Sequence, residues 1–287
     1  MQKRDIRYIN TIPELNVTKT LSDFDINECY SGGKNALFSA NLEKSRWLIE
    51  NGINLNHVDR KRKNAAFYAN TPDKLELLIE SGVNIYQLDM YHRSFMYYMN
   101  AKMIKYLLSD KCSLDLTPII NKKHNTSDPL LFAIGAEKWT LEDFSRFVNK
   151  GGHIFTRNRH KENILIFLNL KSANHLIIPL MQNYKFKNID IRHNNGCIPA
   201  TYAETGNFLL TLTDQPEKNK EIIDYLWENY NKEFRNMADF ICYLHENTNQ
   251  SVKKDYQFLE EYIIAKDKAS LEKTIGSINS VNNKIRI

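Results

Sequence analysis

The chain has 287 residues, of which 42% are hydrophobic and 25% are charged, a composition that supports a folded core and excludes a disordered chain or a fibre. Only 10 residues are Gly and 7 are Pro, which disfavours a strand-and-turn sandwich and favours helices joined by short connections. The net charge of +5 is mildly basic and does not by itself indicate a nucleic-acid-binding protein.

The amino-terminal region, residues 1–30, is too short for a domain and is interpreted as a cap. No apolar stretch follows the first residues, so the sequence predicts no signal peptide. The longest apolar runs, Ile164–Leu170 and Leu176–Met181, are far shorter than the ~20 residues of a membrane-spanning helix. We therefore expect a cytoplasmic protein with no membrane span; a periplasmic location is the alternative if a leader has been removed.

An internal repeat begins at residue 34. The segment Lys34–Ala40 recurs as Lys63–Ala69 and, in a weaker form, as Arg93–Met99. Between these copies, Trp47–Asn54 recurs as Leu77–Asn84. Because two independent segments return in the same order at nearly the same spacing, the sequence predicts a repeated structural unit.

Each unit is predicted to contain two short helices and an extended finger. Asn35 and Asn64 are placed to cap the first helix through the side-chain oxygen. Gly52 and Gly82 end the second helix, since glycine adopts the left-handed conformation without a Cβ clash. One such unit cannot bury its apolar face alone, so we expect the units to stack into a solenoid.

This pattern resembles the ankyrin repeat, whose motif runs Asp, Gly, Thr-Pro-Leu-His and Ala. Asp59 matches the Asp, Asn64 takes the Thr position and Ala69 matches the Ala. Asn-Ala-Ala-Phe replaces Thr-Pro-Leu-His, so asparagine capping is expected in place of the usual Thr–His hydrogen bonds. Weaker copies of the motif occur further along the chain, at Asp128–Ala133, Asn163–Leu168 and Gly196–Ala203.

The resemblance implies an all-α fold, an ankyrin-repeat solenoid of about six helix-turn-helix units with short β-hairpin fingers and helical caps. The domains expected are an amino-terminal cap (1–30), the repeats (31–230), a carboxyl-terminal helical cap (231–276) and a flexible tail (277–287). Insertions in the later units should make the stack irregular.

No catalytic motif, phosphate-binding loop or metal-ligand pattern is found. The four cysteines are scattered, and we expect buried or half-buried free thiols, with Cys197 a packed thiol and not a nucleophile. The eight histidines are interpreted as finger residues, and the 33 asparagines as a bias of codon usage. We therefore expect no enzyme activity, no catalytic residue, no metal and no cofactor.

The densest basic cluster, Arg60–Lys63, lies at a predicted finger tip, where it is either a partner contact or a solvated turn. Successive tips of a solenoid align along one edge, and a strip of Arg and aromatic residues suits a protein contact. Nucleic acid is the weaker reading, because Asp59, Asp89 and Asp190 interrupt the strip. The predicted partner-binding residues are Arg60, Arg62, Gln87, Tyr91, His92, Arg93, Arg157, Arg159, Arg192 and His193.

The leading hypothesis is a non-catalytic protein-binding module, because the repeats are similar to ankyrin repeats of bacterial proteins. Two bacterial roles fit: an immunity protein that binds and neutralises a cognate interbacterial toxin, or a secreted effector or adaptor that acts on a host protein. Either predicts a monomer or a heterocomplex with another protein. An enzyme within residues 231–287 is a third alternative, but the segment carries no catalytic constellation.

Overall fold

The computed structural model describes residues 25–122, 128–160, 162–184, 186, 208–247 and 253–285. Within these ranges every regular element is a helix, and β-pairing is limited to an isolated bridge between Tyr30 and Lys34. The all-α prediction is therefore confirmed for the described residues. The chain divides into two compact units, Met1–Arg159 and His160–Ile287.

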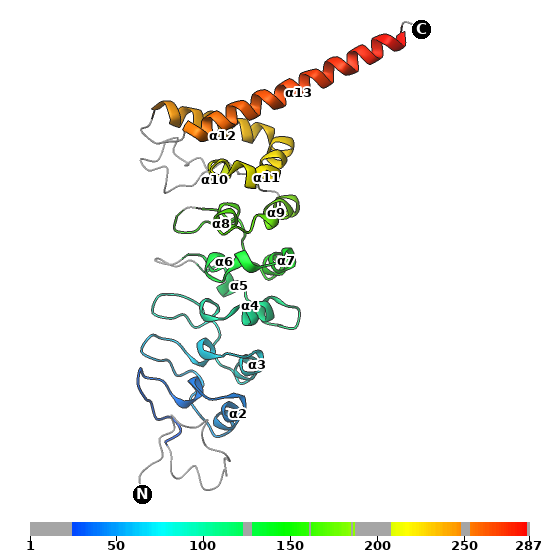
Figure 1. Ribbon diagram of the computed structural model, residues 1–287. Coiled ribbons are helices and arrows are strands. Elements are labelled where there is room, and N and C mark those ends of the chain that lie inside the picture. The colour runs from blue at the N-terminus through cyan, green and yellow to red at the C-terminus, as the bar shows by residue number, and fades with distance from the viewer. Residues whose placement is uncertain are drawn as a thin grey trace. The chain divides into compact units, whose positions relative to one another are not determined.

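The first unit is built from pairs of short helices, each pair a single 3-10 turn followed by an α-helix. Successive pairs lie side by side, with their connecting loops on the same side (Figure 1). The three pairs are η2 (Ala36–Phe38) with α2 (Leu42–Glu50), η3 (Ala65–Tyr68) with α3 (Pro72–Glu80), and η4 (Phe95–Tyr98) with α4 (Ala101–Leu108). The unit continues with α5 (Thr117–Ile120), α6 (Leu130–Ala133), η5 (Ala136–Lys138) and α7 (Leu141–Asn149).

Asparagine side chains start the first two 3-10 turns, as the sequence predicts. The Asn35 Oδ1 accepts from the Leu37 amide at 3.2 Å, and the Asn64 Oδ1 accepts from the Ala66 amide at 3.2 Å. The side-chain nitrogens of the same asparagines donate to the next loop, the Asn35 Nδ2 to the Asn54 carbonyl at 3.1 Å and the Asn64 Nδ2 to the Asn84 carbonyl at 2.7 Å. Each of these side chains therefore caps a helix and holds the following finger.

A second set of asparagines joins neighbouring fingers. The Asn54 amide donates to the Asn27 Oδ1 at 2.8 Å, and the Asn84 amide donates to the Asn56 Oδ1 at 3.0 Å. Asn27 and Asn56 therefore have a structural role that was not predicted from the sequence. Buried backbone groups must find partners, and a short amide side chain can satisfy a donor and an acceptor at once.

Glycines end the α-helices where the chain reverses. Gly52 and Gly82 have φ angles of +83° and +90°, which confirms their predicted left-handed conformation. After α7, a Cβ on Gly152 would lie 2.3 Å from the Phe147 ring, so close packing excludes any larger residue there. Between these ends, Leu48 and Leu78 are completely buried, as expected of core positions.

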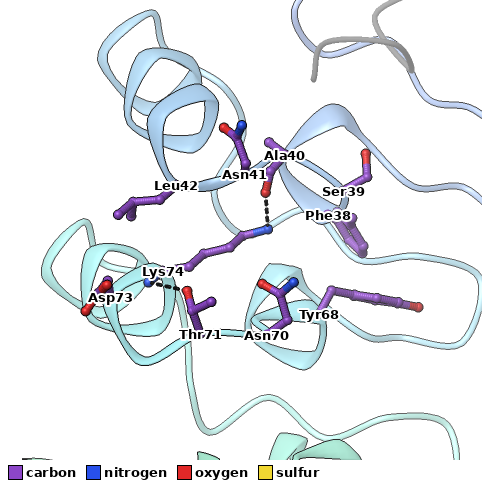
Figure 2. A pocket seen from close by; sticks show the side chains of 10 residues that line it. All are labelled: Phe38, Ser39, Ala40, Asn41, Leu42, Tyr68, Asn70, Thr71, Asp73 and Lys74. Carbon is purple, nitrogen blue, oxygen red and sulfur yellow. Dashed lines mark hydrogen bonds between the residues drawn. The ribbon is translucent and has the colours of Figure 1, made fainter. Parts of the chain in front are cut away.

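A buried lysine joins the second helix pair to the first. Lys74, the third residue of α3, is 2% exposed, and its Nζ donates to the carbonyls of Leu37 at 3.2 Å and Ala40 at 2.6 Å. Figure 2 shows the side chain reaching across to Ala40. Burial lowers the Lys74 pKa to about 8. In α4 the equivalent third position is the apolar Met103.

The second unit contains longer helices. Its core includes the fully buried Phe208, Leu226 and Phe234, and the Trp227 ring packs against Phe234 with centroids 5.6 Å apart. The helices are α8 (Ile164–Leu170), η6 (Asn174–Leu176), α9 (Ile177–Asn183), α10 (Phe208–Thr213), α11 (Pro216–Asn229), α12 (Asn231–Asn247) and α13 (Lys253–Ile285). Helix α13 continues over residues 277–285, for which the sequence analysis expects a flexible tail. The motif copy at Gly196–Ala203 lies outside the described residues.

Candidate protein-binding surface at the finger tips

Two consecutive loops, the first finger (residues 53–63) and the second finger (residues 83–93), have the same backbone. Each tip is a tight turn closed by an amide–carbonyl bond, from Asp59 to Lys63 at 2.8 Å and from Asp89 to Arg93 at 3.0 Å. No strand ladder extends from these bonds within either finger, so the predicted β-hairpin fingers are corrected to hydrogen-bonded turns. The physical reason is that an aspartate at the start of each turn takes the amides that a ladder would use.

The aspartate of each finger organises the tip around its carboxylate. The Asp59 Oδ1 accepts from the amides of Lys61 at 2.8 Å and Lys63 at 2.9 Å, and its Oδ2 accepts from the Tyr68 hydroxyl at 2.6 Å. Both carboxylate oxygens are thus used inside the fold. A charged acceptor with several donors is among the stronger hydrogen-bonded arrangements in proteins, so the turn is held rigidly.

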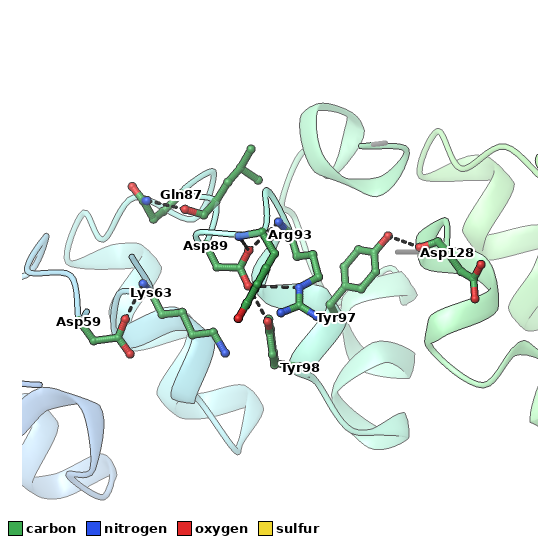
Figure 3. Close-up of polar contacts among 10 residues, drawn as sticks. Asp59, Lys63, Gln87, Asp89, Arg93, Tyr97, Tyr98 and Asp128 are labelled. Atoms are coloured by element: carbon green, nitrogen blue, oxygen red, sulfur yellow. Dashed lines mark hydrogen bonds and ion pairs between the residues drawn. The ribbon is translucent and has the colours of Figure 1, made fainter. Parts of the chain in front are cut away.

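Asp89 repeats this arrangement in the second finger (Figure 3). Its Oδ1 accepts from the amides of Tyr91 and Arg93, both at 2.8 Å, and its Oδ2 accepts from the Tyr98 hydroxyl at 2.5 Å. The Arg93 Nε adds an ion pair at 3.2 Å. Burial raises the pKa of Asp89, but the bonds from Tyr98, Arg93 and Tyr91 and the Arg93 charge outweigh burial and lower the pKa overall.

Cations of one repeat lie on tyrosine rings of the next. The Lys34 Nζ is 4.1 Å from the Tyr68 ring centroid, and the Lys63 Nζ is 3.3 Å from that of Tyr98. Within the second finger itself, the Arg93 guanidinium lies 4.5 Å from the ring centroid of Tyr91. Because each such contact stabilises both partners, the cations are held in place and not left as mobile side chains.

The third residue after each aspartate has a left-handed backbone. Arg62 and His92 have φ angles of 61° and 60°, a conformation that side chains with a Cβ rarely adopt. Glycine would relieve this strain at both positions. Strained residues persist where the surrounding structure enforces them, and they concentrate at functional sites.

The structure brings six of the ten predicted residues together. The Met90 amide donates to the Lys61 carbonyl at 2.9 Å, and the Gln87 Nε2 donates to the Arg62 carbonyl at 3.1 Å, which joins the two fingers. Gln87 and Arg93 are half-buried and serve as internal ties, whereas the remaining four are exposed. The six are Arg60, Arg62, Gln87, Tyr91, His92 and Arg93.

The other four predicted residues are not placed in this group. Arg157 and Arg159 are exposed, and the Arg159 amide donates to the Asp128 Oδ1 at 2.8 Å in a later part of the first unit. Arg192 and His193 lie outside the described residues. A continuous strip that includes all ten thus remains a prediction.

Sequence reasoning missed the apolar side chains around the basic tips. Val58, Tyr86 and Met90 are 39%, 45% and 48% exposed, although large apolar side chains are usually buried. Tyr91 is 46% exposed beside them. We call the exposed group at the turns the tip surface, which comprises Val58, Arg60, Arg62, Met90, Tyr91 and His92; Tyr86 lies before the turn, and its hydroxyl donates to the Asp115 carbonyl at 3.2 Å.

Two structural tyrosines were also missed. Tyr68 and Tyr98 both donate from their hydroxyls to the finger aspartates. Their common position nine residues after Asp59 and Asp89 is a signal in the sequence that could have identified them. Burial and the aspartate hydrogen bond raise the pKa of both hydroxyls.

The charge of the tip surface differs from that expected. Asp59 and Asp89 are 6% and 1% exposed, with their carboxylates turned into the fold. At these two fingers the aspartates therefore do not interrupt the exposed basic residues, contrary to the expectation from sequence, whereas Asp190 lies outside the described residues. The exposed charge at these two tips is cationic.

A cysteine and a histidine lie close together beside the first finger, but they do not form a catalytic pair. The Cys29 Sγ is 3.4 Å from the His57 Nε2, which is also 2.6 Å from the Gly33 carbonyl oxygen. A carbonyl only accepts, so the Nε2 carries the hydrogen and is unavailable as a base for the thiol. Cys29 is exposed, whereas a buried or half-buried thiol was expected.

A pocket of about 500 Å³ lies between the first two helix pairs, lined by residues that include Phe38, Tyr68 and Lys74 (Figure 2). The Lys74 ammonium in its lining donates to two backbone carbonyls, those of Leu37 and Ala40. Across the described part of the chain, no three His, Cys, Asp or Glu side chains gather where they could hold a metal ion. None of the described helices is long and apolar enough to cross a membrane.

Comparisons with known proteins give little further information. No protein-family model matches the chain, and no curated protein matches it. Among solved structures, the chain is similar to a chain in the complex of the predatory endopeptidase Bd0816 from Bdellovibrio bacteriovorus with the immunity protein Bd3460. The identity is 19%, the TM-score is 0.43, and the match covers 62% of this chain and 93% of the other.

Proposed function

We propose that this chain is a non-catalytic protein-binding module of about six ankyrin-type repeats, and that its tip surface contacts the partner. The observation that carries the proposal is the preorganised tip: a buried aspartate, a tyrosine and a cation fix each turn, while Arg62 and His92 take a strained backbone on the exposed side. Rigid positioning lowers the entropy lost on binding.

The partner is proposed to be a protein with an acidic surface. Arg60 and Arg62 supply exposed positive charge, and Tyr91, Met90 and Val58 supply apolar area next to it. Arginine and tyrosine are enriched among residues that dominate protein interfaces. Complementary charge mainly sets the association rate and specificity, so binding should weaken as salt increases.

The biological role proposed is that of a bacterial immunity protein, in which the bound partner is a toxin enzyme that the complex holds inactive. Support comes from the likeness of the repeat sequence to bacterial ankyrin repeats and from the cationic, aromatic tip surface. An effector or adaptor that binds a host protein is the alternative role, and the identity of the captured partner distinguishes the two.

Co-purification from the native cell tests the proposal. The chain is expected to recover a stoichiometric bacterial enzyme, and the double variant Arg60→Glu, Arg62→Glu should lose it. Arg46→Glu is the matched control, because Arg46 is an exposed arginine on α2 away from the tips, and it should retain the partner. Recovery of nucleic acid in place of protein, or equal loss in the control, would refute the proposed surface.

A further inference from the structure

The pocket between the first two helix pairs has a lysine in its lining. Its volume of about 500 Å³ lies in the range of small-molecule sites, about 300–1,000 Å³. Figure 2 shows the Lys74 side chain extending among the lining residues, with its Nζ next to the Ala40 carbonyl. Because Lys74 is 2% exposed, the pocket offers the route by which a molecule from solvent can approach this nitrogen.

The contacts of Lys74 suit a neutral amine. Its Nζ donates to the carbonyls of Leu37 at 3.2 Å and Ala40 at 2.6 Å. A neutral amine has two N–H donors and one lone pair, so it can keep both bonds and leave the lone pair for a molecule in the pocket. Burial lowers the Lys74 pKa to about 8, so about half of the chains carry the neutral amine at pH 8. Desolvated neutral lysines are nucleophiles toward carbonyl compounds.

The other groups of the lining favour an uncharged aromatic ligand. The rings of Phe38 and Tyr68, with centroids 5.1 Å apart, supply aromatic surface. Besides Lys74, the titratable side chains in this lining are Tyr68 and Asp73. The Tyr68 hydroxyl donates to Asp59, whereas Asp73 is exposed and its carboxylate repels anions. A neutral aldehyde with a ring therefore fits the pocket better than an anionic one.

We propose that Lys74 captures small uncharged aromatic aldehydes as a covalent iminium. The Nζ lone pair forms a bond to the carbonyl carbon, and the carbonyl π pair moves to the oxygen, which takes one proton from the nitrogen. The resulting hydroxyl leaves as water with a proton from solvent while the carbon–nitrogen double bond forms. One N–H remains for the bond to the Ala40 carbonyl. The lining contains no residue of the tip surface, so the inference is independent of the proposed function.

Trapping with a hydride donor tests the capture. The full chain is incubated at pH 8 with benzaldehyde and sodium cyanoborohydride, which reduces an iminium to a stable benzylamine, and peptide mapping by mass spectrometry locates the benzyl groups. The pKa shift from 10.5 to about 8 makes the neutral fraction of Lys74 about a hundredfold larger at this pH. Even with restricted access, Lys74 should be modified at least about tenfold faster than the exposed Lys61.

Lys44 is the matched internal control. It is also the third residue of its helix, α2, and is 3% exposed, but it does not line the pocket. Lys44 should therefore stay unmodified. Lys74→Met, which copies Met103 of α4, should remove the fast-reacting site. Equal rates at Lys74 and Lys44, or a Lys74 rate no higher than that of Lys61, would overturn the proposal.

Two further measurements test entry through the pocket. Ser39→Tyr places a tyrosine where the next two repeats have Tyr68 and Tyr98, so it narrows the pocket and leaves Lys74 unaltered. Benzyl alcohol occupies the same space as benzaldehyde without a reactive carbonyl, and its use does not depend on the folding of a variant. Each should slow the modification of Lys74 several-fold and leave that of Lys61 unchanged. An unchanged Lys74 rate in either measurement would overturn the proposal.

Discussion

The second and third helix pairs, with the fingers that precede them, share a backbone but differ in how polar groups stabilise it. Asp59 and Asp89 each accept hydrogen bonds from two amides and one tyrosine hydroxyl at equivalent positions of their repeats. Of these two aspartates, Asp89 alone forms an ion pair with a guanidinium, that of Arg93, within the described part of the chain. At the helix, Lys74 of α3 is replaced by Met103 of α4. The repeat is thus specified by a few short polar side chains, while the intervening positions can vary.

The largest expected effect is loss of the second finger's carboxylate. Asp89→Ala leaves the Arg93 charge, two amides and the Tyr98 hydroxyl without their acceptor, and should lower the free energy of unfolding by about 3–5 kcal/mol. Asp59→Ala should lower the free energy of unfolding by less, because Asp59 forms no ion pair among the described contacts. Urea unfolding measures both, and an equal or larger loss for Asp59→Ala would contradict the comparison.

Acid provides a second measurement of the same carboxylate. The pKa of Asp89 in the folded chain lies below its ordinary value of 3.8, so its stabilisation is complete above that value. It is lost as the pH falls through the lowered pKa. Stability measured against pH should therefore fall less steeply on acidification in Asp89→Asn than in the unaltered chain.

The next effect concerns the lysine that distinguishes α3 from α4. Because burial lowers the Lys74 pKa to about 8 from 10.5, the unfolded chain binds more protons between these values, and stability gains about 3 kcal/mol as the pH rises across them. Lys74→Met, which copies Met103, should abolish this gain. Thermal unfolding from pH 7 to 10.5 measures it, and an unchanged pH dependence in the variant would show that another group is responsible.

Whether a feature could be predicted from the sequence depends on how far apart in the chain its interacting residues lie. Asn35, Asn64, Gly52 and Gly82 act on residues within a few positions, so their roles could be predicted from local stereochemistry. The roles of Lys74 and Tyr98 depend on groups brought close by stacking and turn formation, such as Ala40 and Asp89. Spacing shows that these residues recur, but not which atom each one meets.

The same distinction between local and distant contacts explains which residues of the candidate surface could be predicted. Exposed Arg60, Arg62, Tyr91 and His92 were predicted because a finger tip is local. The half-buried ties made by Gln87 and Arg93 were not predicted, since they require the neighbouring finger or a buried carboxylate. Charge counted along the sequence was misleading for Asp59 and Asp89, because both carboxylates point inward.

A smaller effect is expected from the cap that the two repeats do not share. Asn64 caps Ala66 and donates to the Asn84 carbonyl, whereas Ser94 makes no cap bond and its Oγ has no hydrogen-bond partner within the described structure. Asn64→Ser makes the second repeat like the third and should cost about 1–2 kcal/mol. Thermal unfolding measures the change, and a neutral result would mean that the asparagine ties are dispensable.

The smallest effect has the opposite sign. Arg62→Gly removes a Cβ from a left-handed backbone, so it should stabilise the fold by about 0.5–1 kcal/mol despite the extra freedom of glycine in the unfolded chain. His92→Gly should behave in the same way. Arg60→Gly is the matched control: Arg60 is also an exposed arginine of the tip but has no positive φ, so glycine there should destabilise slightly.

Binding then separates the structural from the functional role of Arg62. If the strain is retained for contact with an acidic partner, Arg62→Gly should raise the unfolding temperature and lower the affinity for that partner in the same sample. A gain in stability with unchanged affinity would leave Arg62 outside the interface. A loss of stability equal to that of Arg60→Gly would mean that contacts of the Arg62 side chain outweigh the backbone strain at the tip.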